Sequence, residues 1–104
     1  MMNRYISIPK NEIGIAEYDT GIDESENLVM MELPEKEFLQ LIPAFSMFND
    51  MFGIMIDDCE SEIIKSENLQ ECYKLINRFG LDVPVFLSAI KEGMKYGTMV
   101  ALDF

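Results

Sequence analysis

The side chains available for chemistry in this 104-residue chain are carboxylates and two thiols, because the sequence contains no histidine. The absence of histidine excludes general acid–base catalysis by imidazole and the Ser/His and Cys/His nucleophile pairs. A glycosidase needs only two carboxylates at a set separation, but so short a chain has little room for a sugar-binding cleft as well. These residue types favour binding over catalysis, so we do not expect an enzyme.

The acidic segments do not fit the motifs of a metal or nucleotide site. A calcium loop that began at Asp19 would have Glu24 at the sixth position, where the tight turn requires glycine. The acidic segment 57–62 lacks that glycine too, and the chain has neither a phosphate-binding Gly-Lys-Ser/Thr loop nor a dinucleotide glycine pattern. Cys59 and Cys72 alone provide too few soft ligands for structural zinc. We therefore expect no cofactor and no metal.

The net charge of −11 is concentrated in one half of the chain. Residues 11–65 contain fourteen acidic residues and two lysines, whereas residues 66–104 contain five acidic and four basic residues. A protein of this charge without a basic stripe would be repelled by the phosphate backbone, so nucleic acid is not the expected ligand. The same field would speed encounter with a basic protein, although acidic loops also serve simply to keep a domain soluble.

The acidic segments supply the partner-binding residues that the sequence predicts. One segment lies in the expected loop 19–27 and the other at 57–62. If these carboxylates form a continuous negative face, they can engage lysine and arginine side chains of a partner protein. The predicted binding residues are Asp23, Glu24, Glu26, Asp57, Asp58, Glu60 and Glu62.

The elements that must position these residues are predicted from periodicity and turn chemistry. Alternating apolar residues predict strands over 4–8 and 13–18, joined as a hairpin through Pro9-Lys10-Asn11, and further strands over 28–33, 54–56 and 98–104. Apolar residues at helical spacing predict one helix from Ser66, which caps it, to Gly80 and another from Pro84 to Gly97. Length and composition indicate a single domain over residues 1–104, an α+β fold with a small antiparallel or mixed sheet and about three helices on one face.

The segment after Pro34 is the most apolar predicted helix. Its phenylalanines at 38, 45, 48 and 52 recur in helical phase, and Pro43 in the middle predicts a kink or two abutting helices. Leu39, Ile42 and the methionines at 47 and 51 widen the apolar stripe beyond one face. This helix is therefore either central to the core or leaves an apolar surface exposed, and flexible methionines would suit a protein partner.

The second half of the chain resembles the small immunity proteins of bacterial polymorphic toxin systems, including contact-dependent growth inhibition. The resemblance rests on size, acidity and the layout of two helices, a glycine stop and a last strand, Gly97-Thr98-Met99-Val100-Ala101-Leu102-Asp103-Phe104. It carries over no functional residue. It implies a cytoplasmic inhibitor that binds one toxin, often a basic nuclease, and blocks its active site or a neighbouring surface.

Two other functions remain open from the sequence. A nucleic-acid-mimicking inhibitor of a restriction or CRISPR enzyme would also be acidic, and a small carboxylate- or metal-dependent enzyme would use the same side chains. The sequence shows no hydrophobic signal segment and no run of about 18 apolar residues. We therefore expect a cytoplasmic protein, with no membrane partner and with both cysteines reduced.

Overall fold

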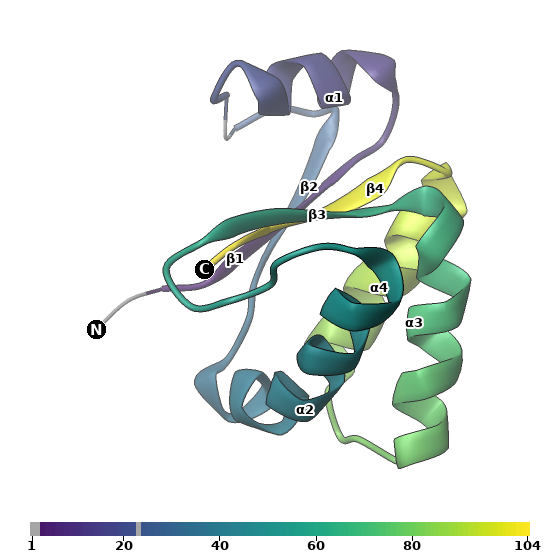
Figure 1. The fold of residues 1–104 in the computed structure, drawn as a ribbon. Coiled ribbons are helices and arrows are strands. Elements are labelled where there is room, and N and C mark those ends of the chain that lie inside the picture. The colour runs from purple at the N-terminus through teal and green to yellow at the C-terminus, as the bar shows by residue number, and fades with distance from the viewer. Residues whose placement is uncertain (1–2, 23) are drawn as a thin grey trace.

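The computed structural model describes residues 3–22 and 24–104, which form one antiparallel sheet and four helices (Figure 1). The strands are β1 (Tyr5–Pro9), β2 (Leu28–Glu32), β3 (Ser61–Lys65) and β4 (Met99–Asp103), in the order β2-β1-β4-β3. The helices are α1 (Glu12–Asp19), α2 (Glu35–Phe52), α3 (Ser66–Phe79) and α4 (Pro84–Tyr96). Helices α2, α3 and α4 cover one face of the sheet and α1 lies on the other. The predicted α+β class, with about three helices on one face, is confirmed.

The core lies between the sheet and the three helices. Side chains alternate along a strand, so one face of each central strand is apolar. On β1 the side chains of Ile6 and Ile8 are fully buried, as are those of Val100 and Leu102 on β4. The last strand of the chain is therefore a central strand, as its apolar composition predicts, because it pairs with β1 on one side and β3 on the other.

The predicted strand over 13–18 is wrong, because this segment forms helix α1. The Asn11 side chain starts the helix by accepting a hydrogen bond from the backbone N–H of Gly14 at 2.9 Å. Such a cap satisfies one of the amides that have no partner inside the helix. Gly14 packs against the backbone of Asn27, where a Cβ atom would collide. Alternation of Ile13 with Ile15 suggested a strand, but Ile13 is 62% exposed, and β1 pairs with β2 instead of this segment.

Helix α2 runs without interruption through Pro43. Of the two predicted alternatives, a kink or two abutting helices, the second is therefore wrong. Proline removes one backbone hydrogen bond and frees the carbonyl of the residue four positions earlier, Leu39. Both Pro43 and Leu39 are exposed, so water can reach that carbonyl. The proline is therefore tolerated because it lies on the outer side of the helix.

Glu37 joins α2 to the start of α4 through a buried carboxylate. Its side chain is 3% exposed, and its two oxygens accept hydrogen bonds from the backbone N–H groups of Val85 and Phe86 at 3.1 and 3.0 Å. These amides belong to the first turn of α4, where intrahelical partners are missing and the helix dipole favours a negative group. A carboxylate in the core is thus stabilised by the helix that it caps.

The connection from α2 to α3 differs from the prediction. No strand forms at 54–56; instead Asn49 of α2 bonds both the N–H and the carbonyl of Ile56, at 2.6 and 3.1 Å. The strand is β3, which begins inside the segment predicted to be an acidic loop and pairs with β4 over its full length. It passes directly into α3, so the N-cap position is occupied by Lys65, and Ser66 is the first helical residue instead of the predicted cap.

Candidate functional site

The fold gathers a group of acidic residues at one end of the sheet, which we name the acidic end. The register pairs Tyr5 with Glu32 on one side and with Asp103 on the other, and Ser61 with Asp103. The loop before β3 joins this end through backbone bonds from Cys59 to the carbonyl of Phe104 and from Phe104 to the carbonyl of Glu60. The acidic end consists of Glu32, Glu35, Asp57, Asp58, Glu60 and Asp103.

Arg4 lies within this group and neutralises part of its charge. Its guanidinium donates two hydrogen bonds to Asp58, at 3.1 and 2.9 Å, stacks 3.8 Å from the ring centre of Phe38, and lies 3.9 Å from a carboxylate oxygen of Glu35. The hydrogen bond from Arg4 holds the pKa of Asp58 below its ordinary value of 3.8. Asp58 therefore stabilises the fold by forming an ion pair with a largely buried arginine. The same ion pair makes its carboxylate less available to a partner protein.

The other predicted residues of the segment 57–62 divide into two kinds. Glu62 is half-buried, and its carboxylate accepts hydrogen bonds from the backbone N–H groups of Met55 and Ile63 at 2.7 and 2.8 Å, so it shapes the loop. Asp57 and Glu60 are exposed. Unlike Asp58, these two carboxylates have no arginine partner among the described residues.

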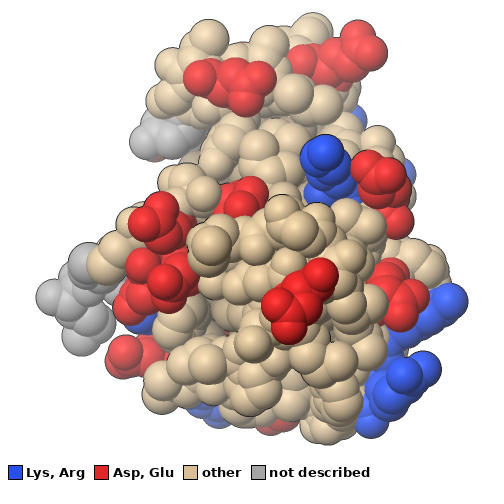
Figure 2. All heavy atoms as spheres, viewed as in Figure 1, with Lys and Arg blue, Asp and Glu red and all other residues tan. Residues whose placement is uncertain are grey.

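The second predicted acidic segment belongs to the α1 side of the sheet. Glu24 and Glu26 are exposed, and the loop that carries them is held by Ser25 and Asn27, whose side chains both bond Glu17 of α1. Asp23 lies outside the described residues. Figure 2 shows the acidic side chains of this face in separate groups with uncharged surface between them. On the face drawn in Figure 2, the carboxylates therefore do not form one continuous negative surface.

The outward side of α2 is apolar, which resolves the alternative left open by the sequence. The buried side of the helix consists of Glu37, Phe38, Leu41, Ala44, Phe45 and Phe48. The opposite side exposes Leu39 at 58%, Ile42 at 48% and Met51 at 47%. No charged residue occurs between Glu37 and Asp50, so about three turns of helix present uncharged surface to solvent. The helix is thus both a core element and an exposed apolar surface.

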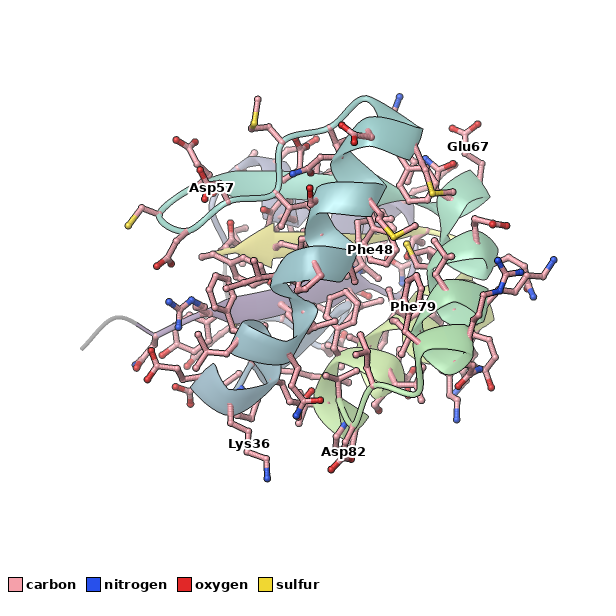
Figure 3. The ribbon with its side chains drawn as sticks, turned by 60° about the horizontal axis from the view of Figure 1, so that its bottom comes forward. Lys36, Phe48, Asp57, Glu67, Phe79 and Asp82 are labelled. Atoms are coloured by element: carbon pink, nitrogen blue, oxygen red, sulfur yellow. The ribbon has the colours of Figure 1, made fainter. Side chains whose placement is uncertain are left out.

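Neighbouring segments extend this surface on both sides of the helix. Met55, 67% exposed, follows α2, and Phe79, 48% exposed, ends α3. Figure 3 shows α2 in front, with Phe79 on one side of it and Asp57 on the other. A shallow groove of about 280 Å³ separates α2 from the segment 55–57, between Ile42 and Met55. We name this surface the α2 strip; it consists of Leu39, Ile42, Met47, Met51, Met55 and Phe79.

Carboxylates border the α2 strip. Asp57 lines the groove beside Ile42, and Asp50 lies on α2 itself between Met47 and Met51. Asp82 lies beside the other end of the helix, where its backbone N–H bonds the Gln40 side chain at 3.2 Å. Figure 3 also shows Glu67 toward the far end of α2 and Lys36 at its start, so the border of the strip is mostly, though not entirely, negative.

The sequence shows that the apolar stripe of this helix is wider than one face, but the binding residues predicted from it are all acidic and include no residue of the strip. The signal that could have identified it is the uncharged run 38–49, in which Leu39 falls on the side opposite the phenylalanines and Ile42 on the flank of the helix. In a helix buried on all sides these positions would also be apolar. The composition alone could not decide between the two arrangements.

The two cysteines occupy different environments. Burial raises the pKa of the Cys72 thiol to about 12, so it stays protonated in the core, and Cys59 lies in the exposed loop before β3. A protonated, buried thiol is a poor nucleophile. Within residues 3–22 and 24–104, the acidic and sulfur-containing side chains nowhere converge in a group of three suited to a metal ion. None of the helices so described has the length and apolar character to span a membrane.

No protein-family model, curated protein or solved structure matches this chain.

The pairing of Arg4 with Asp58 predicts a pH-dependent contribution to stability. Because the folded-state pKa of Asp58 is lowered, the stabilisation is present above the ordinary pKa and is lost as the pH falls through the folded-state value. We expect Asp58→Asn to lower the melting temperature at pH 7 more than the control Glu60→Gln, which alters an exposed carboxylate in the same loop. The difference between wild type and Asp58→Asn should shrink in acid. Equal melting temperatures of the two variants at pH 7 would contradict this role.

Proposed function

We propose that this protein is an immunity-type inhibitor that binds a basic toxin domain through the α2 strip and its carboxylate border. The main support for this proposal is the exposed apolar surface of α2. Its isoleucine and methionine side chains are half-exposed, although the other side of the helix packs in the core. Contiguous exposed apolar surface on a globular domain often marks an interaction site. The flexible side chain of methionine adapts its shape to a partner, which suits a surface that binds over the active site of an enzyme.

The charge distribution supports a basic partner. The net charge of −11 steers the protein toward cationic surfaces, and Asp50, Asp57 and Asp82 stand where the edge of an apolar contact would lie. A second copy of this chain would bring the same sign of charge to the border. Charge therefore favours a lysine- or arginine-rich partner over self-association.

The strip also favours a protein toxin over the nucleic-acid-binding groove of a restriction or CRISPR enzyme. A mimic of nucleic acid needs carboxylates in a dense row to replace phosphates. The acidic groups of the face in Figure 2 are instead separated by uncharged surface. In this proposal the protein acts by binding, in the cytoplasm of a bacterium, and catalyses no reaction.

The direct test is growth rescue with the toxin domain encoded beside this gene. Cells that express this domain should survive when the protein is co-expressed, and the two purified proteins should form a stable complex. Absence of a toxin gene at that position, or of rescue by the wild-type protein, would overturn the proposal.

Loss of apolar surface from the strip should weaken the complex without changing its charge. We expect the double variant Leu39→Gln, Met55→Gln to raise the dissociation constant about 10- to 100-fold, because two apolar anchors of roughly 1 kcal/mol each are removed. Ile13→Gln is the matched control, since Ile13 is 62% exposed on α1, away from the strip. Titration calorimetry measures both, after circular dichroism has shown that the variants are folded. An unchanged dissociation constant for the double variant would place the interface elsewhere.

Reversal of the border charges should act on the rate of association. We expect Asp50→Lys, Asp57→Lys, Asp82→Lys to slow association about tenfold at low salt, with the difference from wild type shrinking as salt screens the charges. The control Glu12→Lys, Glu24→Lys, Glu26→Lys changes the net charge equally on the α1 side. Stopped-flow measurements over a range of ionic strength compare the two. If both triple variants slow association equally, total charge matters and the border does not.

A further inference from the structure

A second concave site lies on the opposite face of the sheet, beneath α1. It has a volume of about 320 Å³, and we name it the α1 pocket. The residues that line its polar part are Ser7, Tyr18, Asp19 and Asp103, and Ile22 and Met30 form its apolar wall. Ser7 and Asp103 face this side because their strand neighbours Ile6 and Leu102 point into the core. The pocket is therefore separate from the α2 strip.

The pocket carries two carboxylates, and the described residues that line it include no lysine or arginine. Asp103 accepts hydrogen bonds from the Tyr18 hydroxyl and the Ser61 hydroxyl, both at 3.0 Å and both at Oδ1. Both donors are neutral hydroxyls that bond Oδ1, so no described cation pairs with Asp103, and Oδ2 can accept a further hydrogen bond. Burial, together with the Asp103 carboxylate, raises the pKa of Tyr18 to about 12, so its hydroxyl remains a donor and adds no charge.

Ser7 provides an observation independent of the acidic groups. The residue is 1% exposed and lines the pocket, and its hydroxyl forms no hydrogen bond with another described residue. Its oxygen is not completely enclosed, so the small surface that it keeps opens into the pocket. A buried polar group without a partner costs free energy, and buried hydroxyls in folded proteins are normally satisfied. Ser7 stands at a central position of β1, between Met30 and Ala101 in the register, and its hydroxyl is available to a ligand in the pocket.

We infer that the α1 pocket binds a primary ammonium or guanidinium group attached to an aliphatic stem. The cation lies between Asp19 and Asp103, the Ser7 hydroxyl accepts one of its hydrogens, and the stem lies along Met30 and Ile22. A metal ion fits less well, because hard cations such as Ca²⁺ and Mg²⁺ require six or more oxygen ligands in a defined geometry. An ammonium or guanidinium group needs only two or three acceptors.

The test is a titration followed by amide chemical shifts of the ¹⁵N-labelled protein. n-Butylamine and agmatine should produce saturable shifts at Ser7, Ile22 and Asp103, whereas butanol and butyrate, which share the stem without the cation, should not. Asp19→Asn should weaken binding at least fivefold and Ser7→Ala about threefold, and Asp57→Asn, which removes a carboxylate outside the pocket, should leave it unchanged. Asp19 is exposed and forms no structural bond among the described residues, so its variant should fold even if Asp103→Asn does not.

The same titration separates the two sources of such a group. A free metabolic amine is indicated if agmatine binds more tightly than N-acetyl-lysine methylamide, whose blocked backbone must remain outside the pocket. A lysine side chain of a second protein is indicated if the blocked lysine binds at least as tightly. Shifts that do not saturate, equal shifts with butanol, or full binding by Asp19→Asn would overturn the inference. These measurements need no toxin, so they are independent of the proposed inhibitory function.

Discussion

The packing of Phe45 of α2 is the interaction on which the rest of the structure depends. Its ring centre lies 5.5 Å from that of Phe86 on α4 and 5.7 Å from that of Phe104, the residue after β4. It also contacts Phe38 and Phe48 on its own helix, at 6.1 and 6.3 Å. Aromatic pairs at these separations stabilise a fold beyond the area that they bury. One side chain thus connects α2, α4 and the end of the central strand.

This packing fixes the rotation of α2 about its axis and therefore determines which residues face solvent. Phe38 and Leu41 point inward, so Leu39 and Ile42, each one position further along the helix, are turned toward solvent. Glu37 holds the same rotation by capping α4 with a buried carboxylate. The exposed strip is a direct consequence of the core, and any other rotation would expose phenylalanine.

Charge has two roles in this protein that the net value of −11 does not distinguish. Glu37, Asp58 and Glu62 are used by the fold, since they cap a helix, pair a buried arginine and shape a loop. Asp50, Asp57 and Asp82 remain at the surface around α2. In the proposed function the second group steers a partner, and the apolar strip provides the affinity. The electrostatic surface therefore assists binding and does not carry it alone.

The sequence predicted the fold class, helices α2, α3 and α4, and strands β1, β2 and β4, because helical spacing, strand alternation and glycine stops are local signals. Helix α1 was missed because its start depends on the Asn11 cap and on contact with Asn27, which is distant in sequence. Strand β3 was missed because its pairing with β4 outweighs the polar character of Ser61, Glu62 and Lys65. For the candidate site, the sequence located the acidic segments, but only the packing of α2 revealed which apolar residues remain outside.

The exposure of the α2 strip in solution is most directly tested by methyl NMR of the methionines with a soluble paramagnetic probe. The methyl signals of Met47, Met51 and Met55 should broaden strongly, since these residues are 37%, 47% and 67% exposed, while that of Met99, 8% exposed, should be protected. Protection of Met47 and Met51 equal to that of Met99 would contradict the structure's central feature, because the strip would then be covered before any partner arrived.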